Sequence, residues 1–236
     1  MKIKRLILLL LLLFIILPAV LICAVGTVRF CRTADALTGN NVRAVTSLQA
    51  QSLEDFFAQR AADLRIFSKL PDTLDLLGQH AKGERRENYP DLLRESNIIL
   101  TTRVRDQSFA LRMSLLDSEG VALASSDEGF IGERTLLSQE DWVRLSQDQV
   151  VISDLRTTPR FQDGLPHFFI AYPILVDGSF EGAAITVMDC SYFSRMIGQD
   201  FSFETGTLTV LDPSGQVAAS GNSQLKGCLL YTSRCV

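Results

Sequence analysis

One twelve-residue pattern occurs twice in this chain, and the repeat restricts what the chain can fold into. Residues 114–125 read SLLDSEGVALAS and residues 209–220 read TVLDPSGQVAAS. Five residues of the first copy recur 95 residues later: Leu116, Asp117, Gly120, Ala124 and Ser125 return as Leu211, Asp212, Gly215, Ala219 and Ser220. Each copy has an apolar run, an Asp-x-x-Gly turn and a second apolar run, which together are typical of a β-hairpin. The spacing predicts two tandem copies of a domain-sized unit. Because the second copy stops soon after it begins, we interpret the chain as the front part of a longer protein.

The N-terminus carries a long apolar run. Three cations among the first five residues precede Leu6–Val25, which contains no charge. About 20 apolar residues are needed for a helix to cross the hydrocarbon layer of a membrane. We therefore predict a cytoplasmic N-terminus over residues 1–5, a transmembrane helix over residues 6–27 and, by the positive-inside rule, an extracytoplasmic remainder at the cell membrane. The alternative is a signal peptide cleaved near Cys23–Gly26.

Composition narrows the classes of partner. The formal net charge is −4, and no basic segment with interleaved aromatic residues is present, so we expect no nucleic-acid partner. The five cysteines are too scattered to form a disulfide framework. Residues 228–236 depart from the repeat, and we interpret them as a non-native tail without assigning them a structure.

The spacing of apolar residues between the anchor and the tail predicts an α+β fold. A long helix is expected over residues 33–69, ended by Pro71, and a second one over residues 90–105, with a polar connector at 78–88. Strands are expected at 109–116, 121–125, 150–153, 167–176 and 180–189, short helices at 139–146 and 192–197, and a loop at 156–166. This order predicts an antiparallel five-stranded sheet with its helices on one face.

Several motifs, in this order, resemble the double Cache family of extracellular sensor domains. They are the long helix after the anchor, the hairpin at Leu115–Gly120, Val-Ile-Ser-Asp at 151–154, and the runs Gly164–Ile174 and Gly182–Asp189. The resemblance covers about residues 33–227. It implies a stalk and helical part at 33–105, a membrane-distal PAS-like ligand-binding module at 106–200, and a truncated membrane-proximal PAS-like module from 206 to 227.

The resemblance also implies the kind of protein that contains such a domain. It indicates the N-terminal fragment of a bacterial signal-transduction receptor, with a second membrane span and a cytoplasmic output domain to follow. A histidine kinase of a two-component system, a diguanylate cyclase or a chemoreceptor would each fit. The alternative is a membrane-tethered binding or adhesion module without cytoplasmic output.

Candidate ligand contacts follow from the same resemblance. Trp142, Asp154 and Asp189 match the amino-acid-binding version of the family, but Glu140 stands where that version has an arginine. Because a guanidinium clamps a carboxylate through two hydrogen bonds, the missing arginine argues against an amino-acid ligand.

The remaining groups suit a small polar metabolite, either an amine or another polar compound. Asp154 and Asp189 could bind an ammonium group beside the ring of Trp142 or Tyr172, whereas Arg156 could meet an anion. Each residue also has a structural alternative: Trp142 as core, Asp154 at a strand end, Asp189 as the N-cap of the next helix and Arg156 in solvent.

Motifs for catalysis are missing. The chain has no Gly-x-Ser-x-Gly elbow, no phosphate-cradling glycine loop and no His-Glu-x-x-His. Cys190 lacks a base partner and fits a buried thiol, and neither His80 nor His167 has metal-ligand spacing. We therefore expect no enzyme in this segment, no catalytic residue, no cofactor and no metal. The apolar stripe of the long helix predicts a parallel homodimer.

Overall fold

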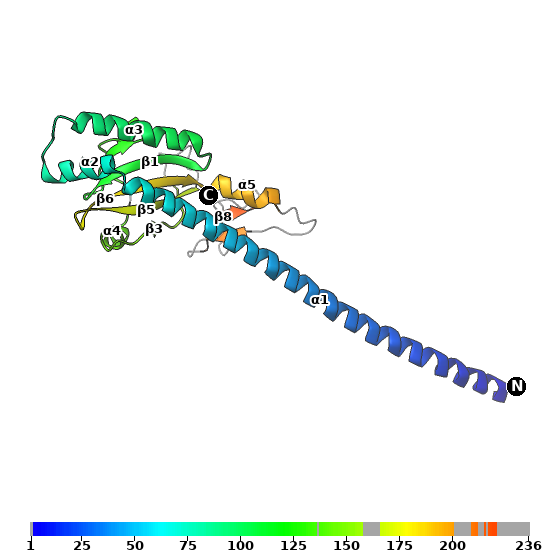
Figure 1. Ribbon diagram of the computed structural model, residues 1–236. Coiled ribbons are helices and arrows are strands. Elements are labelled where there is room, and N and C mark those ends of the chain that lie inside the picture. The colour runs from blue at the N-terminus through cyan, green and yellow to red at the C-terminus, as the bar shows by residue number, and fades with distance from the viewer. Residues whose placement is uncertain are drawn as a thin grey trace. The chain divides into compact units, whose positions relative to one another are not determined.

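The computed structural model in Figure 1 describes most of the chain. The described residues are 2–135, 137–157, 166–200, 209–211, 215 and 217–220, with only the backbone given at 2–22, 24, 34, 157, 166, 197–200, 218 and 219. Two compact units, Met1–Leu53 and Glu54–Val236, make up the chain.

A single helix, α1 (Lys2–Ser68), runs through the first unit and into the second. The helix predicted over residues 33–69 is therefore confirmed, and it begins much earlier than expected. Among the described residues, no helix is both long and apolar enough to span a membrane. The side chains of residues 1–22, which make up most of the predicted span, lie outside the described part of the chain.

A helix that the sequence did not predict follows α1. Pro71 is the first residue of α2 (Pro71–Lys82), a position that proline tolerates because the first N–H groups of a helix have no intrahelical acceptor. Gly83 ends α2 with φ of 66°, and its N–H donates to the carbonyls of Gln79 and His80. The prediction of a polar connector at 78–88 is therefore wrong for its first half. The next helix, α3 (Tyr89–Asp106), agrees with its prediction.

The sheet has the predicted antiparallel five-stranded form. Its strands are β1 (Ala110–Asp117), β2 (Ala122–Ser125), β3 (Val151–Ile152), β5 (Pro166–Val176) and β6 (Ser179–Asp189). Their order is β2-β1-β6-β5-β3. Asp177 and Gly178, with φ of 52° and 84°, join β5 to β6 in the predicted tight turn. A further short strand, β4 (Arg156–Thr157), pairs with β5, so the predicted loop begins later than residue 156.

Helices cover both faces of this sheet. The α4 face, as we call it, carries Leu116, Ile185 and Phe169, which pack with Leu145 of helix α4 (Gln139–Ser146). The short helix η1 (Glu128–Phe130) covers the same face. Helices α2 and α3 contact β1, β2, β5 and β6 from the opposite side (Figure 1). The prediction that all helices share one face is therefore wrong, and the near-continuous apolar runs of β5 and β6 reflect burial on both sides.

Both copies of the sequence repeat form the same hairpin. Ser114 pairs with Ser125 in β1–β2, and Thr209 pairs with Ser220 in strands β7 (Thr209–Leu211) and β8 (Val217–Ser220). A bulge follows the second pair in each case. The paired hydroxyls lie 2.9 Å apart in the first copy and 3.1 Å apart in the second. The hairpin prediction is therefore confirmed for both copies.

Aromatic side chains join the second part of α1 to the sheet and to α5 (Cys190–Asp200). The ring of Phe56 lies 5.3 Å from that of Phe109 and 5.1 Å from that of Phe193, both edge-on. Phe57 lies 5.4 Å from Phe168 of β5 in the same manner. Such edge-to-face pairs add roughly 0.5–1.5 kcal/mol each beyond the area they bury. They fix α5 against α1 within the second unit.

Gly182 provides a test of this close sheet geometry. A methyl group at this position would overlap the backbone carbonyl of Leu116 on the neighbouring strand. We expect Gly182→Ala to lower the free energy of unfolding by about 1–3 kcal/mol, as other overpacked interiors do. Gly129→Ala is the control, because its methyl would meet only the Asp127 carboxylate at an ordinary 3.4 Å. Equal denaturant midpoints for the two variants would contradict the close approach.

Candidate functional site

A row of polar side chains crosses the α4 face where β5 begins and β6 ends. Arg156 of β4 pairs with His167 of β5, and His167 pairs with Asp189 of β6. Directly opposed residues of antiparallel strands lie on the same face, with Cβ atoms about 4.5–5.5 Å apart. His167 is buried, and the other two residues are half-buried. The row therefore places a cation, an imidazole and a carboxylate side by side on a largely apolar surface. We call it the polar row.

Arg112 of β1 extends the polar row. It pairs with Val187, beside a bulge in β1, and so lies on the same face one strand further along. The Arg112 side chain is only 10% exposed, and its guanidinium carbon lies 3.4 Å from the centre of the Phe130 ring. Oδ2 of Asp127 lies 4.0 Å from its Nη1 atom. Burying a guanidinium is costly unless nearby groups stabilise its charge, so this position requires a physical reason.

Arg156 connects the polar row to α4. Its Nη2 atom lies 3.4 Å from Oδ2 of Asp141, and its guanidinium lies 5.0 Å from the centre of the Phe169 ring. Asp141 also accepts hydrogen bonds from the backbone N–H and the hydroxyl of Ser138, which cap α4. The structure thus places Arg156 against a helix start and an aromatic ring rather than in open solvent.

Asp189 has a structural task at this position. One carboxylate oxygen accepts the backbone N–H of Ser191 at 2.7 Å, and the other accepts the Ser191 hydroxyl. These bonds cap the start of α5, which was the structural alternative for this residue. An ionised carboxylate has about four acceptor sites, so capping leaves some of its capacity for a ligand.

Trp142 lies far from the Asp189 end of the polar row. Its ring meets that of Phe180 edge-on, with centroids 5.7 Å apart, and it also packs against Gly120. Phe180 precedes Asp189 by nine residues on β6, or about 30 Å of extended strand. A small ligand in contact with Asp189 therefore does not reach Trp142.

Tyr172 and Asp154 also lie apart from the row. Tyr172 pairs with Ala184, one residue out of step with the pairs of the α4 face, so it lies on the opposite face. Asp154 is exposed between β3 and β4, where its backbone carbonyl accepts the Ser153 hydroxyl at 2.9 Å. Of the five residues proposed from the sequence, the structure brings together only Arg156 and Asp189.

The polar row contains three participants that the sequence reasoning passed over. Arg112 is the only cation in the largely apolar strand β1, and this is a signal that the sequence carries. His167 was considered only as a metal ligand. Asp141 joins the row through the capping box of α4, and a single sequence does not show which strand residue such a carboxylate meets.

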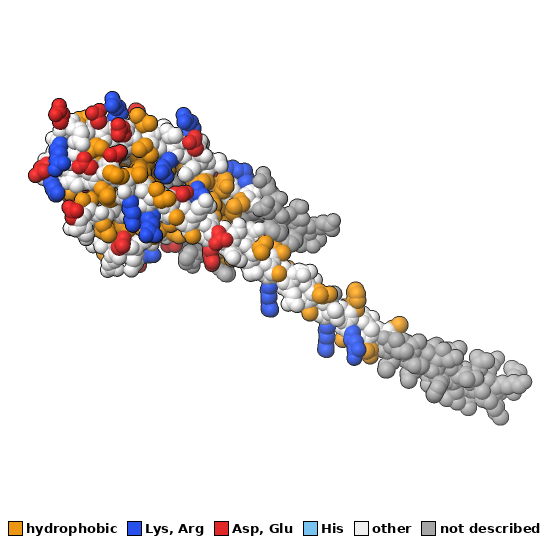
Figure 2. All heavy atoms as spheres, in the orientation of Figure 1, with side chains coloured by type: hydrophobic (Ala, Val, Ile, Leu, Met, Phe, Trp, Pro, Cys, Tyr) orange, Lys and Arg blue, Asp and Glu red, His pale blue; other side chains and the backbone are white. Residues whose placement is uncertain are grey.

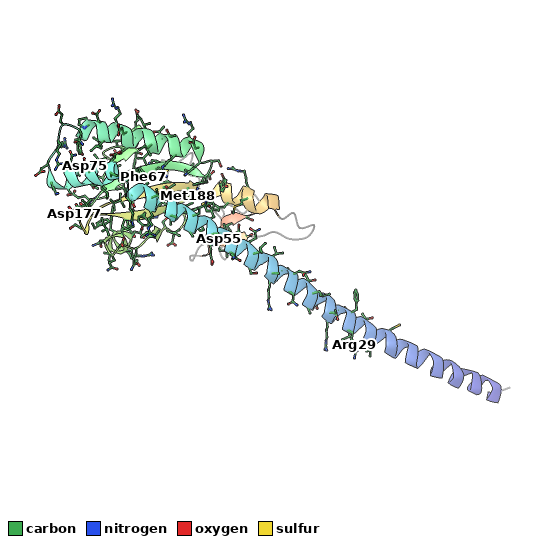
Figure 3. The ribbon with its side chains drawn as sticks, in the orientation of Figure 1. Arg29, Asp55, Phe67, Asp75, Asp177 and Met188 are labelled. Carbon is green, nitrogen blue, oxygen red and sulfur yellow. The ribbon has the colours of Figure 1, made fainter. Side chains whose placement is uncertain are left out.

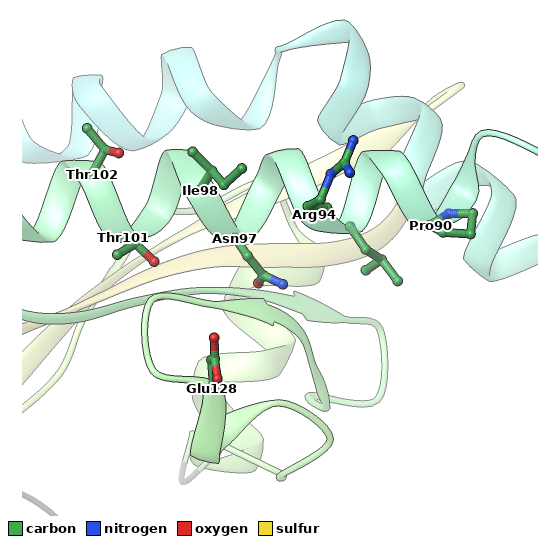
Figure 4. A pocket seen from close by; sticks show the side chains of 8 residues that line it. Pro90, Arg94, Asn97, Ile98, Thr101, Thr102 and Glu128 are labelled. Carbon is green, nitrogen blue, oxygen red and sulfur yellow. The ribbon is translucent and has the colours of Figure 1, made fainter.

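Two hollows lie elsewhere among the described residues. The larger, about 520 Å³, follows α3 and faces η1 (Figure 4), where Arg94, Asn97 and Glu128 line it. The smaller, about 250 Å³, lies between the end of α2 and the turn at Asp177. Neither is lined by a residue of the polar row. Within the described side chains, no three His, Cys, Asp or Glu residues are grouped so as to hold a metal ion.

Known structures share this architecture. No protein-family model matches the sequence, and no curated protein is significantly similar to it. Methyl-accepting chemotaxis protein X is similar with a TM-score of 0.60 and 13% identity, over 82% of this chain and 77% of that one. The ligand-binding domain of the Campylobacter jejuni chemoreceptor Tlp3, in complex with 4-methylisoleucine, gives 0.54 and 15%, over 74% and 66%. The sensor domain of the V. cholerae histidine kinase DctB gives 0.53 and 18%, over 75% and 67%.

These similarities decide the fold. The chain has a Cache-type sensor fold. At these identities the likeness is one of architecture, and the chain spans about two thirds of the Tlp3 and DctB domains. The polar row lies on the α4 face of this Cache-type sheet.

Cys190, next to the polar row, allows a test of burial at this site. Desolvation, assisted by the charge of Asp189, raises the pKa of its thiol to about 12, so the thiolate is absent near neutral pH. We expect iodoacetamide at pH 8 to modify the exposed Cys31 but to modify Cys190 only after denaturation, as read by peptide mass spectrometry. Modification of Cys190 in the folded chain at a rate similar to Cys31 would contradict this burial.

Proposed function

We propose that this chain is the extracytoplasmic sensor portion of a bacterial transmembrane signalling receptor and that it binds a small polar metabolite at the polar row. The observation that carries the proposal is a set of charged side chains, Arg112, Arg156 and Asp189, placed on the largely apolar face of a Cache-type sheet. Such groups are costly to bury for stability alone, and they mark a site where binding is the simpler explanation. The solved structures with this fold include a sensor domain of a histidine kinase and a ligand-binding domain of a chemoreceptor.

The charges favour a ligand that carries an acidic group. Two guanidiniums, of Arg112 and Arg156, lie on the α4 face, and each can hold a carboxylate through two parallel hydrogen bonds. Asp189 between them would receive an amine or hydroxyl of the same molecule. The sequence alone favoured an amine slightly, because it placed Asp154 and an aromatic ring beside Asp189. With those groups elsewhere, the arginines carry more weight.

Binding of an acidic group would change the contacts of α4. Arg156 is held by Asp141 at the first turn of that helix, so a ligand carboxylate competes with Asp141 for the same guanidinium. The two arrangements would differ in ligand affinity, which is all that a ligand-driven change of conformation requires.

The change would reach α5 through Asp189, which belongs to the polar row and caps that helix. Helix α5 in turn contacts β8, where the backbone N–H of Ser220 donates to the Ser194 hydroxyl at 3.4 Å. Spatial contact alone does not establish coupling, so this route is part of the proposal.

The rest of the proposal concerns the membrane anchor, the side of the membrane on which the domain lies and the number of copies. We propose that residues 6–27 anchor the chain in the cell membrane with a cytoplasmic N-terminus, that the sensor domain lies outside, and that two copies form a homodimer. A membrane-tethered binding module without output is the second candidate. The downstream reading frame distinguishes the two, because a second apolar span of about 20 residues is expected only for the receptor.

Arg156→Ala tests the binding site. A thermal-shift screen with amino acids including 4-methylisoleucine, short dicarboxylates and polyamines identifies a compound whose affinity is then measured by calorimetry. Loss of a charge-assisted hydrogen bond costs about 1.5–3 kcal/mol, so we expect Arg156→Ala to weaken binding by about ten- to a hundredfold. Arg144→Ala, an exposed arginine on α4, is the matched control and should bind like the parent chain.

Asp189→Asn separates capping from binding in the same assay. Asparagine caps a helix about as well as aspartate, so the free energy of unfolding should change little. Loss of the charge should nevertheless weaken binding of a ligand that carries an amine. Unchanged affinity in both Arg156→Ala and Asp189→Asn would remove the polar row from the binding site.

A further inference from the structure

His167 is the member of the polar row whose charge can change near neutral pH. Arginine stays protonated in proteins, and an ordinary aspartate titrates near about pH 4. Burial raises the pKa of the adjacent Cys190 thiol to about 12. An ordinary imidazole, in contrast, titrates between about pH 5 and 8. We infer that a carboxylate which binds at Arg156 is bound together with a proton on His167. This inference rests on the proposed binding of an acidic ligand at the polar row.

His167 lies between a cation and an anion. It pairs across the strands with Arg156 on one side and with Asp189 on the other. The row lies at the end of β6 that Met188 marks in Figure 3, opposite the turn at Asp177. Because His167 is only 3% exposed, water and salt screen its neighbours weakly. The carboxylate favours a protonated imidazole and the guanidinium opposes it, so their balance decides whether His167 takes up a proton.

Few other charges reach this part of the sheet. The charged and titratable groups come from five elements: Arg112 of β1, Asp141 of α4, Arg156 of β4, Asp189 of β6 and Cys190 of α5. Asp141 acts through Arg156, and Arg112 lies one strand beyond Asp189. On the face shown in Figure 2, acidic and basic side chains are interspersed over the second unit, so they provide no strong field of one sign. The direct neighbours of His167 therefore dominate.

A carboxylate at Arg156 changes the balance toward the protonated imidazole. In the ligand-free chain, the guanidinium has Asp141 at 3.4 Å. A ligand carboxylate brings a further negative charge to the same guanidinium. At about 6 Å, one unit charge moves a titration midpoint by roughly 0.5 pH unit in bulk water and by roughly 2 units near a protein surface. Because Asp141 already offsets part of the positive charge, we expect a rise of about 0.5–1 pH unit for His167.

The linkage between proton and ligand is reciprocal. Since the bound carboxylate favours protonated His167, protonated His167 favours the bound carboxylate. The affinity is therefore highest below the titration midpoint of the free chain, falls as the pH rises between the midpoints of the free and the bound chain, and is constant again above them. A difference of about 0.5–1 pH unit between the midpoints corresponds to a total change of about three- to tenfold in Kd. One concentration of ligand would then occupy more receptors in acidic surroundings.

The chain contains two histidines, so NMR can follow each imidazole separately. The second, His80, lies on α2, where its Nε2 atom is 3.3 Å from Oδ2 of Asp117. Asp117 is five residues from Arg112 along β1, or about 17 Å of extended strand. His80 is therefore an internal reference that a change in the polar row should not affect. The signal that persists in His80→Gln belongs to His167.

Variants that remove one charge test the coupling without a ligand. In the full chain, labelled at histidine and purified in detergent, Arg156→Gln should raise the titration midpoint of His167 by about 0.5–1 pH unit, and Asp189→Asn should lower it by a similar amount. Arg144→Gln removes an exposed arginine of α4 and is the matched control, which should leave the midpoint unchanged. An equal midpoint in the parent chain and in Arg156→Gln, or an equal rise in Arg144→Gln, would overturn the coupling.

Acetate provides a second measurement, because a high concentration can drive a single carboxylate onto Arg156 by mass action. Replacement of chloride by acetate at constant ionic strength should raise the His167 midpoint in the parent chain and leave it unchanged in Arg156→Gln. The His80 midpoint should be the same in both salts. A rise of equal size in the parent and the variant, or a rise in neither, would overturn the inference.

The outcomes are separable from those of the binding proposal. A compound that loses affinity in Arg156→Ala but binds equally well at about pH 6 and about pH 8 would overturn the proton coupling and leave the binding site standing. Unchanged affinity in both Arg156→Ala and Asp189→Asn would remove the polar row from the binding site, whatever the titration of His167 shows.

Discussion

The strand β6 is buried along most of its length, and the arrangement of the other elements of the second unit follows from this constraint. It lies between β1 and β5, with α2 and α3 on one side of the sheet and α4 on the other. The side chains on both faces must therefore be apolar, or their polar groups must form hydrogen bonds within the protein, because water reaches neither face. Gly182 meets a further requirement, because the Leu116 carbonyl leaves no room for a side chain there. The charges of the polar row are exceptions at the one end of β6 where the strand gives way to a helix.

The contacts of these charged residues bear both on stability and on the proposed binding of a ligand. The three charged members of the polar row each have a partner from a different element: Arg112 has the ring of Phe130, Arg156 has Asp141, and Asp189 has Ser191. Partners of this kind stabilise the charges in the ligand-free state. The contact of Arg156 with Asp141 could still be exchanged for a ligand contact, because a ligand carboxylate would offer the guanidinium a better hydrogen-bonding geometry than a 3.4 Å contact does. A ligand bound as proposed would displace a protein contact of the row, and that exchange would provide the two states that a sensor needs.

Local signals in the sequence were sufficient for the strands and turns but not for the site. Asp177-Gly178 and the Asp117 turn could be read directly, because the conformation of a tight turn is decided by its own residues. Tyr172 and Trp142 were grouped with Asp189 although they lie on the other face and at the other end of the sheet. The face of a residue depends on the register of its strand, and the distance along the sheet depends on which strands pair. Neither is visible in one sequence.

Helix α1 combines two kinds of surface along its length. Near its C-terminal end, Phe56 and Phe57 contact rings of α5 and the sheet, so any shift of α5 acts directly on this part of the helix. Further toward the N-terminus, Phe30, Leu37 and Leu48 are exposed apolar side chains. Because α1 is helical from Lys2 to Ser68, both surfaces belong to one continuous backbone.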